Sequence, residues 1–434
     1  MLQTMDLADR NGLQTARAAM RTGFSIREIA MADAAPHWAL IDGAVRHSTG
    51  GFFAIAGFTD PETGVERLML NQPQGAVNGL ATAVGADGRR VFLLQSRAEP
   101  GNEEEVQFGP SLQSTPANWM RLHGGAPSPY AAAFLEHAAE ARTLVETTQL
   151  DLGGRYVLKS KRVSISEGPQ TQPSEPGFHW TTCEGVLAGL DVDYCFNTDL
   201  RAAIGVAPWS ADPEAGELAP RSELVRRSLA APARAEALGA AIAKLSERIP
   251  APLRPTPIEA LANWEVGQQG LDERRPDQNL SVRFYEIEAR AREMKSWIQP
   301  LIVGRGEGRG LLLCRERGGA AEVFVAVRRE PGLPNGAAFA PSFLAYPGEP
   351  TTTPEWIEAA RPRPWIEVRE SDEGGRFFDH KSRCALMLVE GELSPPVGEE
   401  GVWLRVSELK RLLGLSNLCS IQLRTIASLL LAAP

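Results

Sequence analysis

The densest run of polar side chains in the sequence lies in residues 95–125, which read QSRAEPGNEEEVQFGPSLQSTPANWMRLHGG. If the run opens as a β-strand, alternation puts Gln95, Arg97 and Glu99 on one face until Pro100 ends the strand. An amide, a guanidinium and a carboxylate in a row suit a ligand that carries both hydroxyl groups and charge. Further amide side chains follow at Asn102, Gln107, Gln113 and Asn118. The run therefore predicts a polar binding cleft.

The densest positive charge in the chain is a group of five residues. They are Arg121, Arg155, Lys159, Lys161 and Arg162. Guanidinium groups bind phosphate through bidentate, charge-assisted hydrogen bonds, so the group predicts a phosphorylated ligand. Two alternatives stay open. The lysines form a solvated strand edge, or Arg155, which follows two glycines, is a structural ion-pair partner.

Composition narrows the class of protein. The chain has 434 residues, which favours two or three domains, and its net charge of −9 argues against a nucleic-acid partner. The five cysteines form no CxxC pair, which argues against a disulfide framework or a metal site and fits the cytoplasm. We expect no signal peptide and no membrane partner, because the N-terminus lacks an apolar core and every apolar run is short.

The elements that position these side chains belong to a sequence unit that occurs twice in the chain. HWTTCEGVLAGLDVDYCFNTDLR aligns without a gap on VWLRVSELKRLLGLSNLCSIQLR, at an offset of 223 residues. GGRYVLKSKR aligns on GGRFFDHKSR, and QSRAEPGNEEEVQFGPSLQ aligns on AVRREPGLPNGAAFAPSFL. Three blocks in the same order predict two copies of one unit, which we call the first repeat (20–209) and the second repeat (280–434).

Residues 210–279 separate the repeats and have a different composition. The segment APARAEALGAAIAKLSERIPAPLRPTP starts rich in alanine and ends in prolines, which predicts a linker helix and then an extended spacer. Within each repeat we expect short strands followed by a helix, at TCEGVLAGL and at VSELKRLLGL, the latter with Ser407 as N-cap. The predicted fold class is α+β, or mixed α/β, with two similar domains joined by a helical linker.

The two repeats differ in the polar positions of their third shared block. In the alignment of the two repeats, Gln95 corresponds to Ala326, Asn102 to Leu333, Gln107 to Ala338 and Gln113 to Leu344. We therefore expect an open, hydrogen-bonding cleft in the first repeat and a largely filled one in the second. The alternative is that the amides only cap loop backbone in the first repeat.

The motifs closely resemble those of the NDP-4-keto-6-deoxyhexose 2,3-dehydratases, enzymes of deoxysugar biosynthesis. The matching stretches are QSRAEPGN, VQFGPSLQST, ANWMRLHGG, HSTGGFFAIAGF, NQPQGAVNGL, GGRYVLKSKR and FNTDLR. The resemblance covers most of the chain, and it implies a tandem repeat of a Nudix-like unit, a homodimer and a nucleotide-sugar substrate. It implies neither a cofactor nor a metal, and the metal-binding helix of Nudix hydrolases is absent from the sequence.

The implied reaction removes water across C2–C3 of a nucleotide-linked 4-keto-6-deoxyhexose. It needs a base and an acid, for which we take Glu99 and His123 without choosing between the two roles. Gln95, Arg97, Asn102, Gln113 and Asn118 would bind the sugar, Trp119 would stack on the nucleobase, and Arg121, Arg155, Lys161 and Arg162 would bind phosphate. Alternatively, Glu99 is structural and anchors its strand end through Arg97, and Trp119 simply packs.

The sequence also departs from the family pattern. Gln74 stands where the family has Glu, Pro116 where it has Arg, and Asn78 at an apolar position. Two other functions therefore stay open: a binder of nucleotide sugars that has lost catalysis, and a dehydratase for a different nucleotide sugar.

Overall fold

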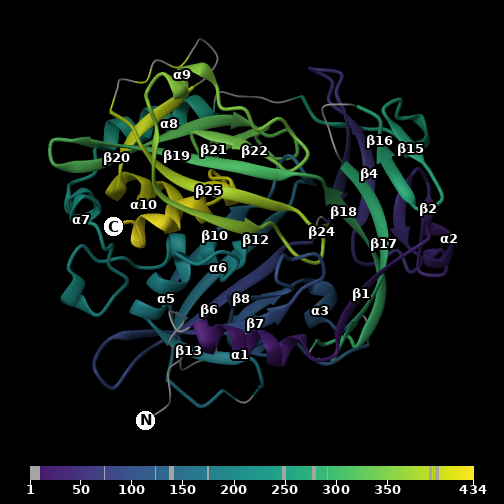
Figure 1. The fold of residues 1–434 in the computed structure, drawn as a ribbon, viewed down its shortest axis with the longest axis horizontal. Helices are drawn as coiled ribbons and strands as arrows, with labels where there is room; N and C mark the ends of the chain where they lie inside the picture. The colour runs from purple at the N-terminus through teal and green to yellow at the C-terminus, as the bar shows by residue number, and fades with distance from the viewer. Residues whose placement is uncertain are drawn as a thin grey trace.

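The protein was analysed as a computed structural model that describes residues 10–72, 74–122, 124–135, 141–173, 175–246, 251–275, 280–290, 292–390, 393, 395 and 400–434. Four β-sheets with helices between them make up this part of the chain (Figure 1). The mixed α/β class is confirmed, and strands predominate. None of the described helices is long and apolar enough to cross a membrane.

Each repeat forms one large sheet, and the two large sheets have the same strand order. In the first repeat the order is β10-β12-β6-β7-β13, with β8 paired to β7 and β9 to β6. Its strands are β6 (Ala76–Val84), β7 (Arg90–Ala98), β8 (Val106–Pro110), β9 (Leu112–Ser114), β10 (Arg142–Leu150), β12 (Ser160–Glu167) and β13 (Phe178–Thr182).

The large sheet of the second repeat has the order β23-β25-β19-β20-β26, with β21 paired to β20 and β22 to β19. Its strands are β19 (Glu307–Arg317), β20 (Ala320–Arg329), β21 (Ala337–Ala340), β22 (Phe343–Ala345), β23 (Arg363–Ser371), β25 (Lys381–Leu388) and β26 (Gly401–Arg405). Every strand of one large sheet thus has a counterpart in the other, which confirms the predicted duplication.

The small sheets also match, and each takes one strand from the other half of the chain. The first contains β2 (Trp38–Ile41), β3 (Ala44–His47), β4 (Ala54–Thr59), β5 (Glu66–Asn71), β11 (Tyr156–Val157) and β14 (Arg254–Pro255). The second contains β15 (Trp264–Val266), β16 (Gly270–Glu273), β17 (Leu280–Ala289), β18 (Ser296–Gly304), β24 (Phe377–Phe378) and β1 (Phe24–Ile29). β1 pairs with β17 and β14 pairs with β4, so each half gives a strand to its partner's sheet.

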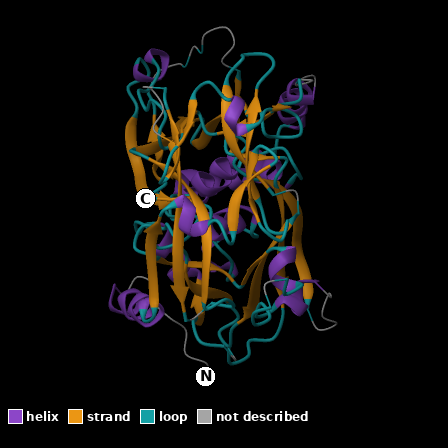
Figure 2. Ribbon diagram, turned by 90° about the vertical axis from the view of Figure 1, so that its right-hand side faces the viewer, coloured by secondary structure: helices purple, strands orange, loops and turns teal. Residues whose placement is uncertain are grey.

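The remaining elements are helices. They are α1 (Arg10–Arg21), α2 (Met31–Ala34), α3 (Pro116–Trp119), α4 (Ala131–Leu135), α5 (Cys183–Leu190), α6 (Thr198–Val206), η1 (Pro213–Ala215), α7 (Glu223–Ala230), α8 (Ala235–Ser246), η2 (Ile258–Ala260), α9 (Glu355–Glu358), α10 (Val406–Gly414), α11 (Ile421–Ser428) and η3 (Leu429–Leu431). One group of helices lies near the middle of the molecule, between the strands, and other helices lie at its periphery (Figure 2).

α6 and α11 are equivalent helices that pack on each other at the centre of the fold. Each starts at a polar N-cap: the Asn197 side chain accepts a hydrogen bond from Leu200 N, and that of Ser420 accepts one from Leu423 N. A Cβ at Gly205 would lie 2.7 Å from the backbone oxygen of Arg424, so glycine lets the two backbones approach closely. The main core cluster includes residues from both helices and both large sheets.

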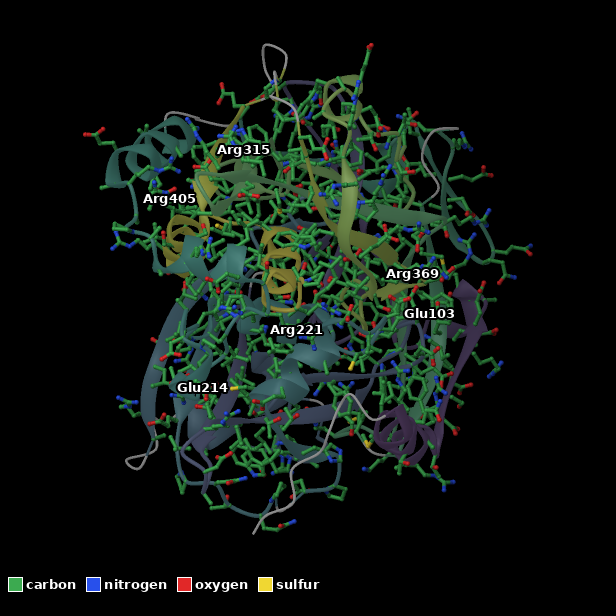
Figure 3. All side chains as sticks on the ribbon, turned by 60° about the vertical axis from the view of Figure 1, so that its left-hand side comes forward. Glu103, Glu214, Arg221, Arg315, Arg369 and Arg405 are labelled. Atoms are coloured by element: carbon green, nitrogen blue, oxygen red, sulfur yellow. The ribbon has the colours of Figure 1, made fainter. Side chains whose placement is uncertain are left out.

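The motifs shared by the two repeats touch across the repeat boundary. The Glu-Pro-Gly turn of the first repeat packs on the Gly-Gly-Arg segment of the second, where Gly375 N donates to Pro100 O at 2.8 Å. The reverse contact also forms, since Gly332 N donates to Gly153 O at 2.9 Å. Around the first contact Glu103 N donates to the Oγ of Ser371, the last residue of β23; Figure 3 labels Glu103 and also Arg369, which lies on β23. Asp379 N donates to Gly101 O at 3.1 Å, and its counterpart Leu158 N donates to Gly332 O at 2.7 Å, so the same contact joins the repeats twice.

Gly101 makes this contact possible, and we expect Gly101→Ala to destabilise the protein by about 3 kcal/mol or more. A Cβ at this position would lie 2.0 Å from Phe377 O, and its φ of +93° disfavours any L side chain. Gly64→Ala is the matched control, because Gly64 has φ +67° with nothing within 4 Å of a Cβ. The control should lose only about 1–2 kcal/mol. Urea denaturation measures both, and equal losses would contradict the role of the close contact.

The sequence analysis placed an extended spacer at the proline-rich end of 231–257 and did not predict the strands β14, β15 and β16. Trp264 of β15 and Leu271 of β16 bury their side chains in the core beneath the small sheets. One detail of the sequence analysis is wrong. Ser407 was predicted as the N-cap of α10, but the cap is Arg405, whose N–H donates to Glu408 at 2.8 Å. The predicted linker helix is present as α8, and the helices predicted at 182–190 and 406–415 are α5 and α10.

Candidate active site

A cavity of about 880 Å³ opens between the first repeat's large sheet and the second repeat's small sheet. The first repeat lines it with parts of 37–53, 76–78 and 97–122 and with Lys161 and Asp199. The second repeat lines it with parts of 286–299 and with 373–376. Both halves of the chain therefore build this one site.

Glu99 lies on the wall of the cavity and is held by three neighbouring side chains. It directly follows Ala98, the last residue of β7, and its carboxylate accepts hydrogen bonds from Arg97 Nε at 2.8 Å, Asn102 Nδ2 at 3.3 Å and Gln113 Nε2 at 3.4 Å. Arg97 also donates to Gln95 Oε1 at 3.3 Å, so the predicted shared face of Gln95, Arg97 and Glu99 is confirmed. The arrangement fixes one buried carboxylate beside an open, polar space.

Lys161 also lines the cavity, but its charge is already neutralised. Its Nζ lies 3.0 Å from Asp151, 2.9 Å from Asp199 and 3.3 Å from Glu373. Burial alone would lower the pKa of Lys161, yet the three carboxylates hold it well above its usual value. Burial raises the pKa of Asp151 to about 6. Tyr156 completes the cluster by donating its hydroxyl to Glu373 at 2.6 Å.

Other predicted site residues lie behind the cavity or away from it. Of the predicted set, the cavity is lined by Arg97, Glu99, Gln113, Asn118 and Lys161. Gln95 and Asn102 lie behind, in contact with Arg97 and Glu99 respectively. Trp119 packs on the apolar cluster around Phe134. His123 lies outside the described residues, although its neighbour Leu122 lines the cavity.

The three remaining arginines have partners elsewhere. Arg121 is exposed and donates to Gly125 O at 3.0 Å, and Arg162 donates to Phe134 O at 2.8 Å. Arg155 is buried, donates to Pro347 O at 3.0 Å and lies 3.6 Å from Glu349. The structural alternative for Arg155 agrees with these contacts. None of the three lines the cavity within the described chain.

The sequence analysis missed the residues that the second repeat contributes. Glu373, Arg376, Arg292 and Glu293 line the cavity together with Trp297 and Gln299. Arg292 lies 3.3 Å from Glu293 and, with Arg97, holds the pKa of that carboxyl at about 2 in spite of its burial. The signal was present in the sequence, because Arg376 belongs to the Gly-Gly-Arg motif that both repeats share. It was overlooked because the second repeat was expected to be degenerate.

The equivalent place in the second repeat is nearly closed. There Leu344 replaces Gln113, Tyr346 replaces Thr115 and Ser382 replaces Lys161, and the space left is about 10 Å³. The Tyr346 hydroxyl donates to Glu330, the counterpart of Glu99, at 3.1 Å. The predicted contrast between an open first cleft and a filled second one is confirmed.

Metal ligands do not gather in the site. Across the described ranges, no group of three or more His, Cys, Asp or Glu side chains is arranged to hold a metal ion.

A family model described as NDP-hexose 2,3-dehydratase matches residues 13–206 and again residues 236–430. The chain belongs to this family. Its two matches fall on the two repeats, which supports the duplication in this chain independently of the strand order. The family resemblance seen in the sequence is confirmed.

Similar proteins within this family carry the same activity in their names. The chain is 27% identical over 415 residues to a dTDP-4-dehydro-6-deoxy-alpha-D-glucopyranose 2,3-dehydratase of Streptomyces violaceoruber, covering 90% of this chain and 89% of the relative. A protein of that name from Saccharopolyspora spinosa is 27% identical over 88% of this chain and 82% of its own length. A third protein of that name, from Amycolatopsis orientalis, is 24% identical over 94% of this chain and 87% of its own length.

Proposed function

We propose that the protein removes water across C2–C3 of a nucleotide-linked 4-keto-6-deoxyhexose, with dTDP-4-keto-6-deoxyglucose as the first candidate substrate. The observation that carries the proposal is the buried Glu99 carboxylate beside an open cavity lined by amides and hydroxyls. The second repeat keeps the same carboxylate and fills the space beside it. The names of the similar proteins support the same substrate.

The reaction follows from the chemistry of the ketone. The C4 carbonyl acidifies the proton on C3, a base removes that proton, and the electrons expel the C2 hydroxyl as water after an acid has protonated it. The enol formed between C2 and C3 then tautomerises to a 3,4-diketo-2,6-dideoxy sugar. Each positioned acid or base typically contributes about 10²–10⁴-fold to such a step.

Glu99 and His123 fill the two proton-transfer roles in this proposal. Gln113 and Asn118 bind the sugar hydroxyls and the keto oxygen, since both line the cavity. Gln95 and Asn102 orient Arg97 and Glu99 from behind. Lys161 keeps the carboxylates of Asp199 and Glu373 in place and leaves little charge for a ligand.

Incubation with dTDP-4-keto-6-deoxyglucose tests the proposed function, with loss of one water followed by mass spectrometry. Turnover supports the proposal. Binding without loss of water would support the non-catalytic alternative suggested by Gln74 and Pro116, of which Gln74 is exposed and Pro116 opens α3. Turnover of a different nucleotide sugar in a substrate panel would support the third alternative.

We expect His123→Ala to lower turnover by about two orders of magnitude or more, the usual scale for an acid–base group. Binding of dTDP should stay near the wild-type value, because the change removes a proton carrier and leaves the nucleotide contacts in place. Steady-state kinetics and calorimetry measure the two effects. Undiminished turnover would remove His123 from the mechanism.

Four finer features belong to the same proposal: a Nudix-like fold for each unit, the boundaries 20–209, 210–279 and 280–434, a homodimer and a cytoplasmic location. The matched strand orders of the repeats support one common fold for both units. The five free, buried cysteines fit a reducing compartment. Light scattering after gel filtration tests the homodimer.

A further inference from the structure

Four basic side chains line the cavity, and three of them already have acidic partners. Arg97 lies 2.8 Å from Glu99, Lys161 is held by three carboxylates, and Arg292 lies 3.3 Å from Glu293. The fourth cation is Arg376 of the second repeat. It makes no ion pair with any side chain in the described part of the chain.

Neutral groups hold Arg376 in place. Its Nη1 donates to Gly375 O at 2.5 Å, and its Nε and Nη2 lie 3.4 Å from Gln72 Oε1. Its guanidinium carbon lies 4.2 Å from the centre of the Phe53 ring. These contacts orient the guanidinium without cancelling its charge.

Comparison with the equivalent arginine supports a ligand for Arg376. Arg155 occupies the same place in the Gly-Gly-Arg motif of the first repeat, and there Glu349 and Pro347 O satisfy it. Arg155 lies over the ring of Tyr346, which lines the closed cleft, whereas Arg376 itself lines the open one. The arginine that lacks an acidic partner is thus the one that lines the cleft that stays open.

The wall beside Arg376 suits a nucleotide. Trp38, His47, Phe52 and Phe53 line the cavity there and contact one another, with ring centroids 4.7–5.2 Å apart. Aromatic rings accept a stacked base, and a guanidinium accepts a bidentate phosphate. Glu373, three residues before Arg376, lies 3.3 Å from Lys161 Nζ, which offsets part of its charge toward an anion.

We propose that Arg376 binds the diphosphate of the nucleotide sugar, with the base lying toward Phe52 and Phe53 and the sugar toward Glu99. The inference rests on the proposed function, because it takes a nucleoside diphosphate as part of the substrate. It replaces Arg121, Arg155 and Arg162 as the phosphate site with one residue from the second repeat.

Titration calorimetry with dTDP tests the inference on wild type, Arg376→Gln, Arg376→Lys and Arg121→Ala. A charge-assisted hydrogen bond corresponds to a loss of affinity of roughly 10- to 150-fold, which is the effect expected for Arg376→Gln. Arg376→Lys keeps the charge but loses the bidentate geometry, so its affinity for dTDP should lie between those of wild type and Arg376→Gln. Arg121→Ala should bind like wild type. Thermal unfolding confirms that each variant is folded.

The outcomes separate the inference from the proposed function. Wild type that binds neither dTDP nor UDP would overturn both. Wild type that binds dTDP, with the Arg376 variants unchanged, would overturn the inference alone. A loss confined to Arg121→Ala would return the phosphate site to the place predicted from the sequence. Binding of thymidine gives a second readout, because the ratio of dTDP to thymidine affinity should fall only in the Arg376 variants.

Discussion

Glu99→Gln is expected to lower turnover by about 100-fold or more, the range for loss of a positioned acid–base group. Glutamine keeps the size of the side chain and can still accept the hydrogen bond from Arg97 Nε, which is 2.8 Å long in the native protein. The change removes the proton-transfer capacity at the wall of the cavity, and it also leaves the buried Arg97 without the charge of its partner. Steady-state kinetics with the 4-keto sugar measures the effect.

Glu330→Gln is the matched control for this experiment. Glu330 has the same relation to Arg328 that Glu99 has to Arg97, but Tyr346 fills the space beside it. The control is expected to change stability and to leave turnover of the folded protein near the wild-type value. Equal losses of turnover in the two variants would show that the paired carboxylates are structural in both repeats, which was the alternative open for Glu99.

The second large effect concerns Lys161. Removing one partner from a buried ionic cluster costs about 3–5 kcal/mol, since the opposite charges stay buried without compensation. Lys161→Met would leave Asp151, Asp199 and Glu373 close together, and the first two are almost fully buried. We therefore expect a loss of that size in the free energy of unfolding, measured by urea denaturation at pH 8.

Acid should partly rescue this variant. Without the lysine, burial and mutual repulsion disfavour the charged forms of the three carboxyls, so the penalty falls as the carboxyls take up protons at lower pH. The stability gap to wild type should thus be smaller at pH 5 than at pH 8. Lys159→Met is the control, because burial lowers the pKa of Lys159 to about 8 and it makes no ion pair among the described residues. A similar loss in the control would contradict the role of the cluster.

Much of the fold could be predicted from the sequence because the same unit occurs twice in the chain. Local patterns located β7 and the helices α5 and α10, and the aligned blocks predicted two copies of one unit, whose strand orders agree in the structure. The exchange of β1 and β14 was not predictable in this way. A two-residue strand such as β14 has no period to detect, and its pairing with β4 depends on contacts nearly 200 residues apart.

The site was predicted where one segment supplies it and missed where two segments meet. Gln95, Arg97 and Glu99 follow from alternation along a single strand, so their shared face was predictable. Arg121 and Arg162 were grouped with the phosphate site by charge and proximity in sequence, but the fold turns their side chains to other partners. Arg376 reaches the cavity only through the contact between the repeats, and no local pattern encodes that.

The contact that is made twice has a consequence for how one cleft could close. In a symmetric dimer of identical chains, any substitution appears at both equivalent positions, so a residue such as Tyr346 would block both clefts together. Here the two units share one chain, and position 115 can keep threonine while position 346 holds tyrosine. Because both units are encoded in one chain, two equivalent surfaces can carry different residues. One surface is free to serve chemistry, while its counterpart supplies rigidity and, through Arg376, a side chain to the cavity it faces.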